Sequence, residues 1–199
     1  KQKTAYEIST RDWSSDVCSS DLDMRTSLDL FLDDVVWGSG GPRAGGHRSD
    51  YRRLFTDDEV FVNGRLAPFL GVALPTDAAF RRVRLDAGRR GGVLTHPYMA
   101  SVLSYSGGTS PIHRGVFLAR TVLGNVLKPP PEAVAPLAPD LHPGLSTRQR
   151  VEVQTSAVAC QTCHTMINPL GFALEEFDAV GRYRVAERLG DAEKPVDAS

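Results

Sequence analysis

The stretch Cys160-Gln161-Thr162-Cys163-His164 decides how the rest of this sequence is interpreted. In a C-x-x-C-H pentapeptide, the two thiols add across the vinyl groups of a haem, and the adjacent histidine becomes the proximal ligand of the iron. The chain has three cysteines in 199 residues, and two of them lie in this motif. The motif therefore predicts covalent attachment of haem c through Cys160 and Cys163, with His164 as the proximal iron ligand.

The third cysteine, Cys18, lies in a segment that we expect to be foreign to the protein. Residues 1–22 closely resemble a translated sequencing adapter, and they show no sustained period of two or of 3.6 residues. Segments of such origin are left out of a fold prediction. Without them, both remaining cysteines belong to the haem motif.

The composition argues against several classes of partner. The net charge is −1, which gives no electrostatic reason to expect nucleic acid or an anionic membrane. No stretch approaches the roughly 20 apolar residues of a membrane span. Because haem is attached through thioethers on the outer side of the bacterial inner membrane, the motif predicts a periplasmic or otherwise extracytoplasmic protein.

In the N-terminal half, apolar residues at helical spacing predict a helix over 25–37. A glycine-rich loop follows at 38–46. Residues 56–59, Thr-Asp-Asp-Glu, form a capping box, which predicts a second helix over 56–71. Apolar and basic residues alternate over 79–85, which predicts a short strand whose arginines form a solvated face.

Farther along, Ser110-Pro111 predicts the start of a helix that ends near Gly124 or Asn125. A proline-rich crossing occupies 128–143. These elements indicate a mainly α protein with long irregular crossings rich in proline and glycine.

Around the motif, a helix over 147–159 is predicted to deliver the chain to Cys160. Residues 168–171, Asn-Pro-Leu-Gly, predict a turn, and 172–177 a short helix with Glu175 on its solvent face. We expect this C-terminal part to form a cytochrome c-like helical haem module.

Five blocks of sequence occur together in this order: FVNGRLAPFLGV (61–72), RRGGVLTHPYMASVLSYSGGTSPIHRGVFLARTVLGN (89–125), KPPPEAV (128–134), STRQRVEV (146–153) and CQTCHTMINPLGFALEEFDAVGRYR (160–184). In them the chain resembles the multi-domain, cytochrome-associated exported proteins common in planctomycetes, which are built from consecutive domains of unknown function. Many relatives have a histidine shortly before the first haem cysteine, where this chain has Gln154-Thr155, and often an aspartate where this chain has Asn168.

The resemblance implies a division into four parts. Residues 1–22 are the foreign segment, 23–86 the tail of an upstream helical domain, 87–187 a domain of unknown function that carries the haem motif, and 188–199 the truncated start of a following domain. The chain is then a fragment at both ends, and its expected partners are other domains of the same parent chain and a redox protein.

The sequence does not identify the sixth ligand of the iron, and the function of the haem depends on which residue occupies that position. Met166 lies too close to His164 to reach the opposite haem face, which leaves Met99, His96, His113 and His142 as candidates. His96 and His113 lie in blocks shared with the relatives. A methionine opposite the proximal histidine raises the haem potential, a second histidine lowers it, and an empty position permits small-ligand binding.

The leading prediction is therefore an exported c-type haem domain that transfers electrons within a larger protein or to a partner. The alternative is a scaffold or binding module in which the motif is structural or binds zinc through two thiolates and His164. A thiol–disulfide protein is a further interpretation, but the Cys-x-x-Cys of such proteins normally follows a strand, whereas a helix is predicted before this one. No catalytic constellation is visible, so the sequence leaves enzymatic activity open.

Arg182 and Arg184 could pair with haem propionates, although an exposed strand is the simpler interpretation.

Overall fold

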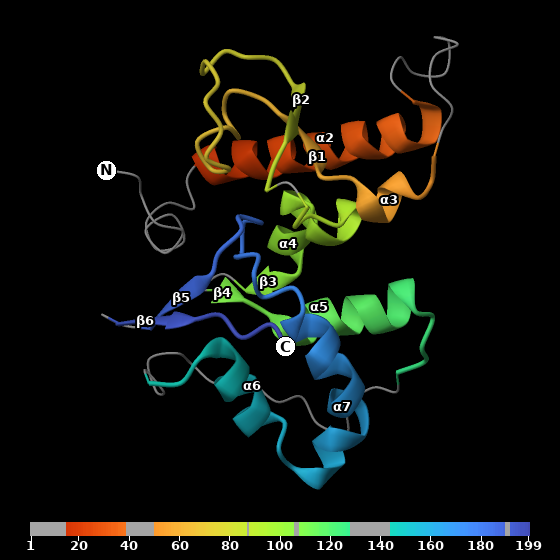
Figure 1. Cartoon of the computed structure of the whole chain (residues 1–199), viewed down its shortest axis with the longest axis vertical. Coiled ribbons are helices and arrows are strands. Elements are labelled where there is room, and N and C mark those ends of the chain that lie inside the picture. The colour runs from red at the N-terminus through yellow and green to blue at the C-terminus, as the bar shows by residue number, and fades with distance from the viewer. Residues whose placement is uncertain (1–14, 39–49, 87, 106–107, 128–143, 190–191) are drawn as a thin grey trace. The chain divides into compact units, whose positions relative to one another are not determined.

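The computed structural model describes six stretches of the chain, residues 15–38, 50–86, 88–105, 108–127, 144–189 and 192–199, with side chains from residue 21 onward. They form two compact units (Figure 1). The first contains the described residues up to Val102 together with Val180–Arg182, and the second contains Leu103–Ala179 and Tyr183–Ser199. The predicted loop over 38–46, apart from Gly38, and the crossing over 128–143 lie outside the described residues.

The long helix α2 (Ser15–Trp37) supplies much of the core of the first unit. Its apolar residues Met24, Leu28, Phe31 and Val35 recur every three to four positions, and all four are buried, as expected for one face of a helix. The helix begins at Ser15, ten residues before the predicted start at residue 25.

The predicted helix over 56–71 is wrong. A short helix, α3 (Arg53–Thr56), ends where it was expected to begin, and strand β1 (Glu59–Val62) follows. Val60 and Val62 are buried while their neighbours are half-buried, so burial follows the two-residue period of a strand. The predicted strand over 79–85 is confirmed as β2 (Arg81–Arg84), which pairs antiparallel with β1.

His96 is a buried polar residue of the first unit. It lies between a 3-10 turn (Gly92–Thr95) and helix α4 (Pro97–Val102). Its Nδ1 accepts the backbone N–H of Tyr98 at 3.2 Å, and its Nε2 lies 3.3 Å from Ser27 Oγ. The Ser27 hydroxyl donates to the Phe61 carbonyl, so Ser27 Oγ accepts from His96 Nε2. Burial, followed by the nearby charge of Arg90, lowers the pKa of His96 to about 3.

The second unit begins with two short antiparallel strands, β3 (Ser104–Tyr105) and β4 (Gly108–Thr109). Helix α5 (Pro111–Phe117) follows, and Ser110 caps it by accepting the N–H of His113, so the predicted start is confirmed. The helix continues as a π-helical turn (Leu118–Val122) and ends before Gly124, which has a positive φ of 70°.

The predicted helix over 147–159 is in fact two helices, α6 (Thr147–Gln154) and the beginning of α7 (Val158–Phe172). The predicted turn at 168–171 is wrong, because α7 runs through Pro169. The predicted helix over 172–177 is wrong as well, since the residues after Phe172 form turns. A hairpin of β5 (Ala186–Leu189) and β6 (Ala192–Pro195) follows.

Helices α5 and α7 cross with their backbones in direct contact. A Cβ atom added at Gly115 would lie 2.0 Å from the Ile167 carbonyl oxygen, and one added at Gly171 would lie 1.9 Å from the Pro111 carbonyl oxygen. The two glycines therefore permit a close approach that a larger residue would prevent. This packing, along the buried Ile167 and Phe172, explains why α7 stays helical past Pro169.

The described fold thus combines helices with three two-stranded antiparallel sheets. The sequence predicted the strand over 79–85 but not the other strands of these sheets. No described helix combines the length and the hydropathy that a membrane crossing needs.

We expect Gly171→Ala to lower the free energy of unfolding by about 3 kcal/mol or more, because the added methyl overlaps a backbone carbonyl that cannot move alone. Urea unfolding followed by circular dichroism measures the loss. Gly108→Ala is the matched control, since no atom lies within 4 Å of its added Cβ. Equal stability of the two variants would contradict the close crossing.

The protein should lose stability as the pH falls from 7 to 5. An unfolded histidine takes up a proton near pH 6.5, whereas folded His96 stays neutral until about pH 3, so the unfolded state binds more protons in this window. The expected loss from this residue is about 2 kcal/mol, measured by urea unfolding at each pH. His96→Asn should remove this component and His113→Asn, at an exposed position, should keep it; the opposite pattern would contradict the assignment.

Candidate functional site

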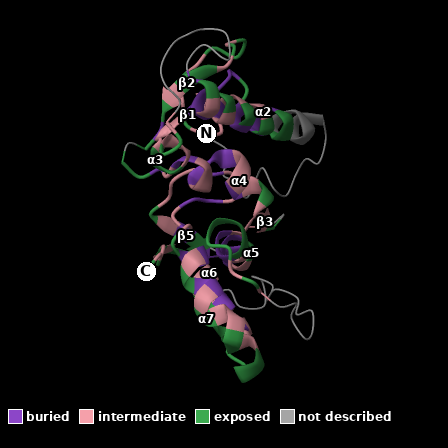
Figure 2. Cartoon of the chain, turned by 90° about the vertical axis from the view of Figure 1, so that its right-hand side faces the viewer, coloured by how far each residue is buried: buried purple, intermediate pink, exposed green. Residues whose placement is uncertain are grey.

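Cys160, Cys163 and His164 lie in the first half of α7. Positions i, i+3 and i+4 of a helix share one face, so the two thiols and the imidazole lie side by side along α7. All three residues are half-buried, and both thiols are free of disulfide bonds. Figure 2 shows that α7 is exposed at its beginning and more buried farther along, so the motif lies on the accessible part of the helix.

A chain of three hydrogen bonds holds the imidazole of His164. Its Nδ1 lies 2.8 Å from Asn168 Oδ1. The Asn168 amide donates to Thr155 Oγ1 at 2.9 Å, and the Thr155 hydroxyl donates to the Val151 carbonyl at 2.8 Å. Val151, Thr155 and Asn168 are all buried. This chain of hydrogen bonds is hereafter called the His164 relay.

The direction of these bonds fixes the tautomer of His164. A backbone carbonyl only accepts, so the Thr155 hydroxyl must donate to it and use its own oxygen to accept from Asn168. The Asn168 oxygen then faces His164 and requires a hydrogen on Nδ1. In a neutral ring this leaves the free lone pair on Nε2, which is the arrangement that second-shell partners give to metal-binding histidines.

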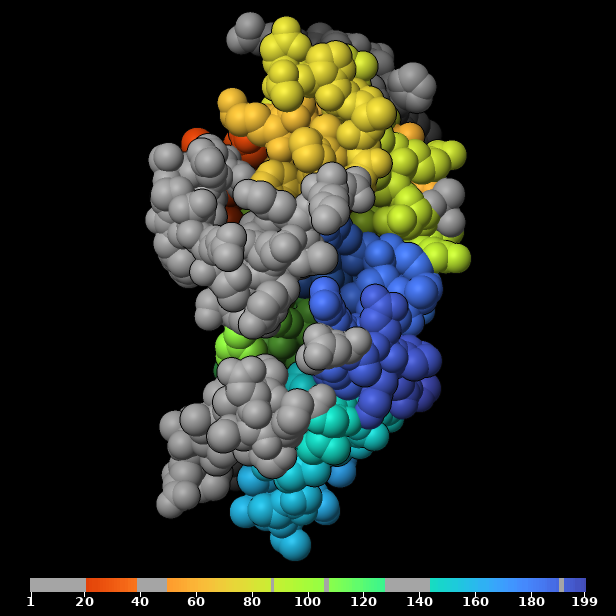
Figure 3. Space-filling view, turned by 90° about the vertical axis from the view of Figure 1, so that its left-hand side faces the viewer, coloured from red at the N-terminus to blue at the C-terminus, as the bar shows by residue number. Residues whose placement is uncertain are grey.

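A shallow groove of about 440 Å³ runs between α6 and α7, and His164 and Asn168 line it together with Arg148 and Phe172. The Arg148 guanidinium lies over the Phe172 ring, 4.6 Å from its centre. Figure 3 shows side chains of both helices, in cyan and light blue, at the molecular surface. A planar aromatic group and a cation therefore lie at one end of a groove that reaches the imidazole.

Several large apolar side chains of the second unit remain exposed. Val158 begins α7 and is 84% exposed, and Val153 at the end of α6 is 53% exposed. On another side of α7, Asn125 Nδ2 donates to Met166 Sδ at 3.3 Å, which holds the segment after the π-helical turn against the helix. In that segment Val126 is 95% exposed.

The candidate sixth ligands lie in different surroundings. His113 is exposed on α5, its ring 4.9 Å from that of Tyr105. His96 is buried in the first unit with both ring nitrogens engaged, and Met99 packs against the cluster of Leu28 and Phe31. His142 lies outside the described residues, and the sixth ligand stays open. In the described part of the chain, no three His, Cys, Asp or Glu side chains gather as a ready-made metal site.

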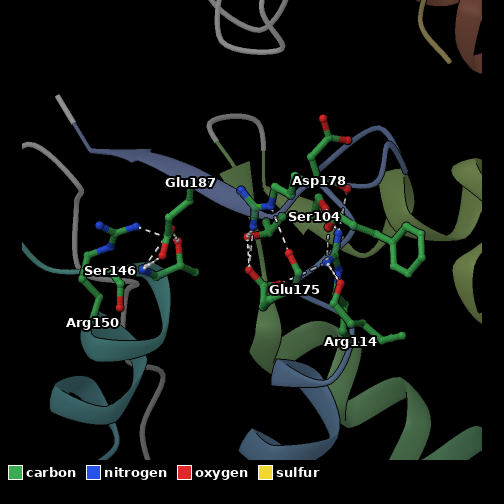
Figure 4. Close-up of polar contacts among 12 residues, drawn as sticks. Ser104, Arg114, Ser146, Arg150, Glu175, Asp178 and Glu187 are labelled. Atoms are coloured by element: carbon green, nitrogen blue, oxygen red, sulfur yellow. Dashed lines mark hydrogen bonds and ion pairs between the residues drawn. The ribbon is translucent and has the colours of Figure 1, made fainter. Parts of the chain in front are cut away.

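A buried arginine organises the chain that leaves α7 (Figure 4). Arg114, 1% exposed, donates through Nη1 to the carbonyls of Leu174 at 2.8 Å and Phe177 at 2.7 Å. Its Nη2 donates to the Asp178 carbonyl at 3.0 Å and to Ser104 Oγ at 3.3 Å. Among the described side chains, its Nε–H is a buried donor without a partner. A planar, five-donor group is the side chain suited to such a turn.

Glu175 completes this cluster. Its carboxylate accepts from Arg114 at 3.1 Å, from the Thr109 hydroxyl at 2.6 Å and from Arg184 at 3.1 Å. Burial raises the pKa of Glu175, and the charges of Arg114 and Arg184 oppose that effect. The expected solvent-facing position of Glu175 is therefore wrong, since the residue is 2% exposed.

Arg184 belongs to this internal network, with its Nε donating to the Glu175 carbonyl at 3.0 Å. Tyr183 packs its ring edge against Phe177 at 5.9 Å, and the two residues form an isolated antiparallel bridge. Arg184 is therefore already engaged inside the protein, so residues 182–184 do not form an open site for haem propionates. They do not form an ordinary exposed strand either.

The three motif residues are candidates from the sequence alone, whereas the residues that support His164 are visible only in the structure. The prediction of a turn over 168–171 does not bring Asn168 to His164. Thr155 lies 13 residues from Asn168, just after the end of a separate helix. A helical interpretation of 158–172 would have placed Asn168 four residues after His164 and suggested the contact. Arg114 and Glu175 are far apart in sequence, so no local pattern could have paired them.

We expect Glu175→Gln to lower the free energy of unfolding by about 3 kcal/mol, because Arg114 would stay buried without its counter-charge. Urea unfolding measures the change. Glu176→Gln is the matched neighbour, because its carboxylate accepts from the Tyr183 hydroxyl at 3.4 Å, a longer contact than those of Glu175. If both variants were equally stable, the buried pair would not be a main support of the unit.

No curated protein and no solved structure matches this chain. A family model does match, over residues 90–187. That range includes the motif, the His164 relay and the cluster of Arg114 and Glu175. Residues 90–187 thus match the family described as PSCyt3, a protein of unknown function (DUF1588).

Proposed function

We propose that the second unit binds haem c covalently through Cys160 and Cys163, with His164 as the proximal iron ligand. The observation that carries the proposal is the donor set on α7: two free thiols and an imidazole share one helix face, and the His164 relay leaves Nε2 as the ring nitrogen with a free lone pair. The abbreviated name of the matching family also suggests an association with cytochromes.

The residues fit the group in three respects. Thiols three residues apart on a helix match the two attachment points that a C-x-x-C-H motif provides. The histidine is oriented by a buried partner, as metal-binding histidines are. The exposed valines near the beginning of α7 supply apolar surface that a macrocycle would cover.

Haem bound in this way supplies a one-electron redox centre. The protein's contribution is to hold His164 in one orientation, to present the thiols on an accessible helix and to keep that helix fixed on α5. The proposed role is electron transfer within a larger multi-domain protein or to a redox partner, outside the cytoplasm where thioether attachment takes place.

A scaffold role is the second candidate, and a specific observation favours it. The crossing of α5 and α7 and the cluster around Arg114 support the second unit through residues outside the motif. A unit supported in this way needs no cofactor for its core.

A pyridine haemochrome spectrum of the chain, exported to the periplasm with the cytochrome c maturation machinery, tests the proposal. After acid–acetone extraction, we expect about one haem per chain to remain, with the α-band of two thioether bonds. Cys160→Ala should shift the band to that of one thioether bond, because only Cys163 would then attach.

Double substitution of Cys160 and Cys163 by alanine is the control and should retain no haem after extraction while the circular dichroism spectrum stays unchanged. Folded wild-type protein without retained haem would contradict the proposal and support the scaffold role. A stoichiometric zinc content in that protein would indicate the zinc alternative.

A further inference from the structure

We propose that Asn168 and Thr155 are positioning residues that select the tautomer of His164 and, in the haem-bound protein, set how strongly its imidazole donates electrons. The role in the haem-bound protein rests on the proposed function, whereas the tautomer is a property of the chain alone. Neither residue belongs to the C-x-x-C-H motif.

The relay connects two helices. Thr155 is the C-terminal cap of α6, and its backbone N–H bonds back to the Val151 carbonyl, as its hydroxyl also does. Asn168 lies in α7, 9% exposed, and places its two amide atoms between Thr155 and His164. An asparagine amide has one accepting and one donating end, so a fixed acceptor at Thr155 decides which end faces the imidazole.

Burial makes this selection effective. Thr155 is 6% exposed and Val151 7%. A reversed amide would set its carbonyl oxygen against the Thr155 oxygen, two acceptors with no hydrogen between them, and would turn its N–H group toward His164 Nδ1. Because a buried polar group without its partner is costly, we expect the observed direction to be preferred by roughly tenfold to hundredfold. The Val151 carbonyl therefore fixes the direction of all three hydrogen bonds in the relay.

A purely structural role would look different. An asparagine that only ties α6 to α7 needs its bond to Thr155, and its oxygen could face water. Here the oxygen lies 2.8 Å from His164 Nδ1, on the residue whose other nitrogen would bind iron. A stronger acceptor at position 168 would increase the electron donation of the imidazole, and loss of the acceptor would decrease it.

The first test is the tautomer of the haem-free full chain, measured by long-range ¹H–¹⁵N correlation spectra at a pH where the ring is neutral. The His164 signals are identified by their loss in His164→Gln. We expect hydrogen on Nδ1 in the wild type and a mixture of tautomers in Thr155→Val, because the Asn168 amide can then reverse. Thr165→Ala is the control: Thr165 is exposed in the same groove and its hydroxyl donates to the Gln161 carbonyl, so the wild-type tautomer should persist.

The second test is the midpoint potential of the haem-loaded chain by potentiometric titration. Asn168→Asp should lower the potential, because a carboxylate accepts the Nδ1 hydrogen more strongly, and Asn168→Leu should raise it. Thr165→Ala should leave it unchanged. Unchanged potentials in both Asn168 variants, or a wild-type tautomer in Thr155→Val, would overturn the relay. Absence of haem in the wild type would instead overturn the proposed function, and the tautomer spectra would still decide the relay.

Discussion

The close crossing of α5 and α7 is the constraint on which the second unit depends. Gly115 and Gly171 let each helix approach the backbone of the other, so the two axes are fixed by contacts that tolerate almost no change in side-chain size. Arg114 projects from the same stretch of α5 and gathers the carbonyls of the chain that leaves α7. One short helix therefore fixes both the course of α7 and the path of the segment after it.

This arrangement leaves the beginning of α7 free for chemistry. The buried end of the helix carries the packing, and the accessible end carries the two thiols and His164. The His164 relay extends the rigidity of the core to the imidazole, because Asn168 and Thr155 are buried. A site placed on a well-supported helix and held by buried partners has the preorganisation that a cofactor ligand requires.

The sequence predicted those features that depend on local pattern. The helix start at Ser110, the strand over 79–85 and the motif residues follow from capping, alternation and spacing. Predictions that depended on tertiary contacts were wrong. The capping box at Thr56 precedes a strand, because Val60 and Val62 are buried on one face of a hairpin.

The turn predicted from Pro169 and Gly171 was wrong because it, too, relied on local pattern without the tertiary contacts. Proline disfavours a helix interior and glycine weakens it, but here the glycine is required by α5 and α7 continues past the proline. The pairing of Glu175 with Arg114 spans 61 residues, so no local pattern could reveal it.

The central claim is that haem is bonded to this helix, and mass spectrometry of the tryptic peptide 151–182 tests it most directly. This peptide contains both motif cysteines and no internal lysine or arginine. After export with the maturation machinery, the account predicts a peptide heavier by the mass of one haem, with fragment ions that place the addition on Cys160 and Cys163. An unmodified peptide, or one that carries only a disulfide bond, would contradict it.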